Sequence, residues 1–147
     1  MSSKEELDIE KIQYLFIRDI SFDYLMPRTP PSKERQSIHY KVNIEKNVSE
    51  DDKIIILLFN IELKTLDRNN EEITGNYISE HLFKIENLEE FIKKREDFFE
   101  IDDQIDNALT SLAYSTIRGL LYHKFSGTPF SNFILPVTRP ADLAGTA

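Results

Sequence analysis

The sequence predicts an α+β fold in which four β-strands come first and one long helix comes last. Between residues 12 and 85, apolar and polar side chains alternate with period two in four segments that polar or proline-rich turns separate. From Leu88 onward apolar residues recur at helical spacing, first in a short helix with irregular ends between Leu88 and Phe99. Chains in which strands precede helices belong to the α+β class.

The length and composition fit a single domain. The chain has 147 residues, of which 40% are hydrophobic and 11% aromatic. A chain of this size buries about 68–70% of the surface that it would expose when unfolded. We expect a mobile acidic segment over residues 1–10, one domain over residues 11–143 and a tail over residues 144–147. The absence of cysteine excludes disulfides and thiolate metal sites.

The first strand is the most strongly specified element. Residues 12–27 read IQYLFIRDISFDYLMP, and in an extended chain Asp19, Ser21 and Asp23 would share the polar face. The residues expected on the apolar face are Tyr14, Phe16, Ile20, Phe22 and Tyr24. Prolines at positions 27, 30 and 31 cannot continue a hydrogen-bonded ladder, so the strand is followed by a loop.

Three further strands are expected over residues 38–45, 53–66 and 73–85. The third strand is apolar along one whole face, and Ile54, Ile56 and Leu58 make the first half of its other face apolar as well. We therefore expect that half to be covered on both sides. The run DRNNEE at residues 67–72 is typical of a hairpin turn.

The long helix is expected over residues 103–124. Asp102 or Asp103 can cap its N-terminus, and Gly127 with Pro129 closes its C-terminal end. Its apolar stripe is wider than one contact with a sheet requires. Such a helix is usually buried on two sides, which indicates contact with a second subunit.

The charge and the chain ends exclude several classes of protein. The net charge of −8 argues against a nucleic-acid partner, because binding to phosphates depends on lysine and arginine. Solubility explains the acidic excess, and an acidic face for a basic partner is the alternative. The N-terminus lacks the apolar stretch of a signal peptide, and no apolar run is long enough to span a membrane. We expect a cytoplasmic protein.

The chain shows no recognisable catalytic motif. His39, His81 and His123 have no metal-ligand spacing, and four glycines are too few and too scattered to build a phosphate-binding loop. Residues 126–128, SGT, are explained by a helix C-cap and turn. The acidic run over residues 96–106 could hold a cation, although acidity at a helix start explains it more simply. We expect no enzymatic activity, no metal and no cofactor.

Three segments, in order along the chain, carry a resemblance to a known family. They are residues 16–23, FIRDISFD, followed by Pro27; residues 82–85, LFKI; and residues 127–137, GTPFSNFILPV, followed by Asp142-Leu143. Together they are similar to the signature segments of the SecB export chaperone family. The resemblance covers about residues 12–143.

The resemblance implies a four-stranded antiparallel sheet with the long helix packed on one face, assembled as a dimer of dimers. The proline-containing segment 25–36 would cross between the first two strands. In the family, this loop and the second strand line apolar grooves that hold unfolded polypeptide. The implied groove residues are Leu25, Met26, Val42 and Ile44. The implied subunit contacts are Gly75, Tyr77, Ser79, Leu112 and Leu120.

The function that the resemblance implies is that of an ATP-independent holdase for unfolded or precursor polypeptides, acting in protein export with the translocase motor SecA. Two departures bear on this. Glu80-His81 replaces the usual glycine pair, and the chain ends four residues after Leu143, so the family's second helix and SecA-contacting tail are expected to be missing.

Two alternatives stay open. One is a SecB-like chaperone dedicated to a single partner such as an antitoxin. The other, from a different class, is a small sheet domain that binds a small ligand.

Overall fold

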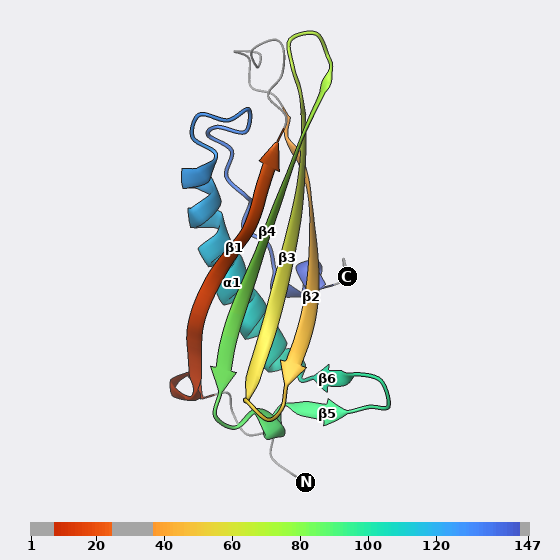
Figure 1. Ribbon diagram of the computed structural model, residues 1–147, viewed down its shortest axis with the longest axis vertical. Helices are drawn as coiled ribbons and strands as arrows, with labels where there is room; N and C mark the ends of the chain where they lie inside the picture. The colour runs from red at the N-terminus through yellow and green to blue at the C-terminus, as the bar shows by residue number, and fades with distance from the viewer. Residues whose placement is uncertain (1–7, 25–36, 145–147) are drawn as a thin grey trace.

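A computed structural model describes residues 8–24 and 37–144 (Figure 1). The predicted crossover segment, with Leu25 and Met26, lies outside the described residues, as do most of the expected N-terminal and C-terminal segments. The elements are η1 (Ile9–Lys11), β1 (Ile12–Tyr24), β2 (His39–Ser49), β3 (Ile54–Leu66), β4 (Glu72–Ile85), η2 (Leu88–Glu90), β5 (Ile92–Lys94), β6 (Phe99–Ile101), α1 (Asp103–Lys124) and α2 (Pro140–Ala144).

The four long strands form one antiparallel sheet in the order β1-β4-β3-β2. β2, β3 and β4 follow one another as a meander, whereas β1 lies beyond β4, so β1 and β2 are the two edges. Helix α1 runs along one face of this sheet (Figure 1). The predicted α+β fold, with four strands first and a long helix on one face, is confirmed.

The core lies between the sheet and α1. Alternate side chains of β3 face the helix and are at most 1% exposed, because they point to the covered face of the pleat. These residues are Ile55, Leu57, Phe59, Ile61 and Leu63. The helix contributes one buried stripe to the same core, consisting of Ile105, Leu109, Ala113, Ile117 and Leu121.

Both ends of α1 follow the sequence prediction. The Asp102 carboxylate accepts a hydrogen bond from the backbone N–H of Gln104 at 2.9 Å, which satisfies one of the free donors at the helix start. The helix ends at Lys124, and Gly127 beyond it adopts a φ of 78°, a conformation that favours glycine.

The predicted apolar face of β1 is wrong at two residues. The register with β4 shifts between Tyr14 and Phe16 and again between Asp19 and Ser21, so each bulge reverses the alternation of the residues that follow. Phe16 and Ile20 are 48% and 45% exposed instead of buried. Asp19, expected on the polar face, contacts the core residue Tyr77.

The predicted short helix between Leu88 and Phe99 is also wrong. This segment contains the single turn η2 and then a small hairpin, in which β5 pairs with β6. The Arg95 guanidinium and the Glu100 carboxylate lie 2.6 Å apart across the hairpin. The loose apolar spacing that predicted a helix comes instead from two short strands.

The face of the sheet opposite α1 is open. We expected the half that carries Ile54, Ile56 and Leu58 to be covered on both sides, but no described helix or strand lies over it (Figure 1). These three side chains remain partly exposed. Within one chain the expectation is therefore wrong, and the open face is available to a partner.

Candidate binding surfaces

Two of the four groove residues inferred from the resemblance lie in the core of the described structure. Val42 and Ile44 are each 3% exposed and belong to the core. They lie on β2 beside α2, so access to them would require the C-terminal segment to move. Their role in binding a client stays a prediction, as does that of Leu25 and Met26 outside the described residues.

The inferred subunit contacts separate into two groups. Gly75, Tyr77 and Ser79 are buried on the face of β4 that α1 covers, whereas Leu112 on the helix is 47% exposed and Leu120 is partly exposed. Only the helix residues can meet another subunit without rearrangement.

Gly75 has a local role in packing. A Cβ added there would lie 2.7 Å from Cε2 of the Phe130 ring, so the close approach of this ring requires glycine. The C-terminal segment is thereby seated against β4.

Apolar side chains gather on the open face of the sheet. Phe16 pairs with Leu82, and Leu82 pairs with Ile56, so one row of apolar residues crosses three strands. We call this surface the outer apolar patch. Its members are Phe16, Ile20, Ile54, Ile56, Leu58, Ile78 and Leu82. The apolar second face of the third strand indicated part of this patch, but the bulges that add Phe16 and Ile20 could not be read from the sequence.

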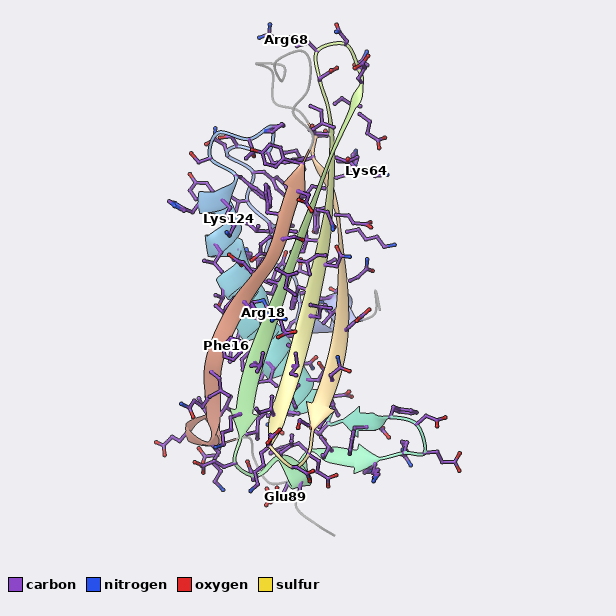
Figure 2. All side chains as sticks on the ribbon, in the orientation of Figure 1. Phe16, Arg18, Lys64, Arg68, Glu89 and Lys124 are labelled. Atoms are coloured by element: carbon purple, nitrogen blue, oxygen red, sulfur yellow. The ribbon has the colours of Figure 1, made fainter. Side chains whose placement is uncertain are left out.

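Polar side chains follow the outer apolar patch along the open face. Phe16 and Arg18 lie close together on β1, and Lys64 lies farther along the sheet (Figure 2). The Arg18 guanidinium approaches the Glu80 carboxylate at 3.5 Å. Asn60, Glu62 and Asn76 make the next stretch of the open face polar, before the exposed Leu66 at the end of β3, so apolar and polar parts meet on the same surface.

Comparisons with known proteins address the fold. No family model and no curated protein matches the sequence. Among solved structures, the SecB-like chaperone Rv1957 of Mycobacterium tuberculosis, in complex with a ChAD peptide from the Rv1956 HigA1 antitoxin, has a TM-score of 0.62 with 13% sequence identity. The match covers 88% of this chain and 91% of that chain.

The chain has the SecB-like fold. A protein of unknown function from Streptococcus agalactiae is also similar, with a TM-score of 0.45 and 10% identity over 86% of this chain and 97% of that chain. The similarity to the M. tuberculosis chaperone, with its TM-score of 0.62, confirms the fold that the sequence segments implied.

A buried polar network lies inside this SecB-like core, beneath α1. The fully buried His81 ring bonds to the Tyr14 hydroxyl through Nδ1 and to Ser79 Oγ through Nε2, the latter at 2.8 Å. A neutral imidazole donates at one nitrogen and accepts at the other, so both partners are satisfied without a charge. Although serine and histidine are adjacent, both are fully buried and no substrate could reach them.

Burial sets the titration of this network. Burial lowers the pKa of His81 to about 4, and the nearby negative charge of Asp19 offsets only part of this shift. Burial likewise raises the pKa of Tyr14 to about 12. For Asp19 burial acts against ionisation, but hydrogen bonds from Lys124 and Tyr77 outweigh it and place the pKa of this carboxyl below its usual value. Lys124 approaches Asp19 at 2.8 Å, which connects the end of α1 to β1.

Among the described residues of the SecB-like fold, grooves lie against the sheet at two places. One, of about 710 Å³, lies near the polar half of the sheet and is lined by Tyr24, Glu62 and Asn76 among others. The other, of about 320 Å³, lies between β2 and the β5–β6 hairpin. The larger one falls in the size range of small-ligand pockets, which is about 300–1,000 Å³.

The described residues show neither a metal centre nor a membrane span. No group of three or more histidine, aspartate or glutamate side chains among residues 8–24 and 37–144 is placed to hold a metal ion. In the same part of the chain, no helix combines the length and the apolar character that crossing a bilayer requires.

Proposed function

We propose that this protein is an ATP-independent molecular chaperone that binds unfolded polypeptides through exposed apolar surface and has no enzymatic activity. The observation that carries the proposal is the outer apolar patch on an otherwise well-packed SecB-like fold. Contiguous apolar surface on a folded protein is typical of sites that bind other proteins.

The energetics of holding a client follow from this surface. Burial of apolar area contributes about 25 cal/mol per Å², so one short segment of a client binds weakly. Several equivalent sites on an oligomer raise the effective concentration and with it the overall affinity. No nucleotide or cofactor is required for such a mechanism.

The proposal includes a homo-oligomer, a dimer of dimers. The exposed Leu112 and the partly exposed Leu120 lie on the outward side of α1 and are its proposed contacts. Gly75, Tyr77 and Ser79 stay proposed subunit contacts, which would require a rearrangement because they are buried on the face of β4 that α1 covers.

In addition to the outer apolar patch, we propose the client groove that the resemblance implies. Leu25 and Met26 would contact the client directly, and Val42 with Ile44 would become accessible when the C-terminal segment moves from β2. Clients would be exported or aggregation-prone polypeptides. Delivery to SecA is a separate proposal, which a SecA-binding assay tests.

A dedicated partner is the second candidate. The similar structure from M. tuberculosis contains an antitoxin peptide, which favours one specific polypeptide over a broad set of clients. A single peptide that competes with all denatured clients, at a concentration far below theirs, would distinguish this candidate from a general holdase.

The deciding experiment measures aggregation. A chemically denatured test enzyme is diluted into buffer with increasing amounts of this protein, and light scattering is recorded. We expect suppression near an equimolar ratio, with serum albumin at equal mass as the control. Unchanged scattering at several-fold excess would contradict the holdase proposal. Native mass spectrometry tests the oligomer in parallel, and a bound small molecule there would favour the ligand-binding alternative.

A further inference from the structure

The strand register arranges part of the open face in rows that cross β1, β4 and β3. In one row Phe16 pairs with Leu82, and Leu82 pairs with Ile56. All three side chains are apolar and none is buried. We call this row the central band. In the described part of the chain, no helix or strand lies over it (Figure 1).

The rows on either side of the central band carry opposite charges. On one side Glu80 of β4 pairs with Leu58 of β3. On the other side Lys84 of β4 pairs with Ile54 of β3. Each flanking row therefore places a charged residue on β4 beside an apolar residue on β3, and the two charged residues lie at equal distances from the band along β4.

This arrangement is complementary to a second copy of itself. When two open faces meet with a twofold axis along the central band, the band contacts itself and each flanking row contacts the opposite one. Lys84 of one copy then faces Glu80 of the other, and Ile54 faces Leu58. Both contacts occur twice. Sheets packed face to face lie about 10 Å apart and about 30° from parallel, which brings such side chains together.

The ion pairs within one chain leave these charges available. The Arg18 guanidinium approaches the Glu80 carboxylate at 3.5 Å, and the Arg18 side chain is 62% exposed. A carboxylate has two oxygens and can accept a second cation. Lys84 is exposed, and none of the ion pairs among residues 8–24 and 37–144 includes it.

The other members of the flanking rows bring no like charges together. Arg18 and Gln13 are the β1 residues of the two rows, so the guanidinium of one copy faces a neutral amide of the other. Glu45 and Ser49 are the corresponding residues of β2, so this carboxylate faces a neutral hydroxyl. The twofold arrangement is therefore attractive at β4 and neutral at both edges.

The size of the contact makes it reversible. Three strands about 4.8 Å apart and about five residues of each strand, at about 3.3 Å per residue, give a footprint of about 240 Å² per copy. Stable protein interfaces bury about 1,200–2,000 Å² in total. The net charge of −8 also opposes contact between copies. Such a contact forms at high concentration and separates on dilution.

We propose that the outer apolar patch closes on the same patch of a second copy when no client is bound. The central band forms the middle of this contact, and the Lys84–Glu80 pairs flank it. The inference rests on the proposed function, in which the same patch binds the client. A weak self-contact protects the apolar surface from water in the resting protein and gives way to an unfolded polypeptide. It is separate from the proposed α1 contacts, since α1 lies on the other face of the sheet (Figure 1).

The first test exchanges the two charges. Lys84→Glu places carboxylates of the two copies against each other, and Glu80→Lys does the same with ammonium groups. Each variant alone should self-associate at least about tenfold more weakly than the unaltered protein. A mixture of the two variants brings opposite charges together again, so unlike copies should recover the affinity.

Analytical ultracentrifugation from micromolar to millimolar subunit concentration provides the measurement. The signal is association beyond the oligomer that is present at low concentration. Recovery on mixing distinguishes a contact between copies from an effect within one chain, because neither variant regains its own missing charge. A mixture that associates as weakly as its components overturns the arrangement.

Two phenylalanines test the apolar centre. Phe16→Ser removes an apolar side chain from the central band and should weaken self-association about tenfold. Phe98 is 64% exposed beside the β5–β6 hairpin, which projects sideways from the end of the sheet (Figure 1). Phe98→Ser is therefore the matched control and should leave self-association unchanged. Equal effects of both variants, or of neither, overturn the location.

Competition by a client provides a third measurement. A reduced and alkylated test protein, which stays unfolded without denaturant, is added in excess to the dye-labelled protein at a concentration where the self-contact forms. We expect the additional association to disappear, because client and second copy occupy the same patch. Its persistence beside bound client overturns the masking of the patch.

These outcomes separate the inference from the proposed function. If self-association depends on Lys84, Glu80 and Phe16 while aggregation of a denatured enzyme is not suppressed, the self-contact stands and the holdase proposal fails. If aggregation is suppressed while sedimentation shows no association that these variants alter, the holdase proposal stands and the self-contact is excluded.

Discussion

The same strands make both faces of the sheet, but α1 covers only one of them. On the covered face, apolar residues continue along the whole length of β3 and meet α1. On the open face they are interrupted halfway, after Leu58, by the polar residues Asn60, Glu62 and Lys64. Apolar alternation therefore predicts which side chains avoid water, but it does not predict which element covers them. In a single subunit, the apolar half of the open face is therefore accessible to a partner.

The largest expected effect comes from two neighbouring leucines. Leu57 faces α1 and is 1% exposed, whereas Leu58 faces the open side and is partly exposed. We expect Leu57→Ala to lower the free energy of unfolding by about 2–5 kcal/mol, because it leaves a cavity in the core. Leu58→Ala should lower it by less than about 1 kcal/mol. Urea denaturation measures both, and equal losses would show that the two faces are equally covered.

The covered face should also make stability depend on pH. His81 titrates near 6.5 in the unfolded chain and near 4 when folded, so the unfolded state binds the proton more readily. Its contribution is complete above pH 6.5 and is lost as the pH falls toward 4, by about 3 kcal/mol in total. Asp19, with its lowered pKa, contributes only to a further loss below its unfolded value of 3.8.

The variant His81→Gln isolates this effect. The variant can be less stable at every pH. The free energy of unfolding should nevertheless change less between pH 6.5 and 4, because the contribution of His81 to this change is gone. Urea denaturation at four pH values in this window provides the measurement. An unchanged slope would mean that His81 is accessible to protons in the folded protein.

A smaller effect is expected at the start of the helix that covers the inner face. Asp102→Ala removes the hydrogen bond to the Gln104 N–H and a favourable negative charge at the helix N-terminus. The free energy of unfolding should fall by about 1 kcal/mol. Asp103→Ala, one residue later and without this capping bond, is the control and should have a weaker effect in the same thermal or urea denaturation.

The smallest effect on stability is expected on the open face. Phe16→Ser should change the free energy of unfolding by less than about 0.5 kcal/mol, because the side chain is already half exposed. The same variant should bind less of a fluorescent dye that reports exposed apolar surface and should suppress aggregation less well. A large loss of stability would show instead that Phe16 is covered in the assembled protein.

Local patterns were sufficient to predict most of the fold. The alternation of Ile55 to Leu63 and the capped stripe of α1 each depend on residues close in sequence. Bulges in β1 were not predictable, because an extra residue such as Leu15 has no local signature and depends on pairing with β4. The hairpin β5–β6 was missed for a related reason, since strands of three residues are too short to show a period.

The candidate site was less predictable than the fold. Val42 and Ile44 were assigned by resemblance, which gives a position along β2 but not which face it presents. The pairing of Tyr14 with His81 joins residues 67 positions apart, and only the folded register brings them together. The groove beside Phe98 depends on the hairpin that was interpreted as a helix.

The position of β1 has a consequence for how the protein is made. Of the described strands, β1 is made first, but it pairs with β4, the last of the four long strands to be made, and Arg18 meets Glu80 across 62 positions of sequence. β2, β3 and β4 can form a meander from neighbouring segments, while β1 must wait for the far side of that meander to be synthesised. During this interval Ile12, Tyr14 and Phe22, which pack against the core in the folded protein, are unprotected. A newly made copy of this protein is therefore, for a time, the same kind of exposed apolar chain that the proposed function would have it bind.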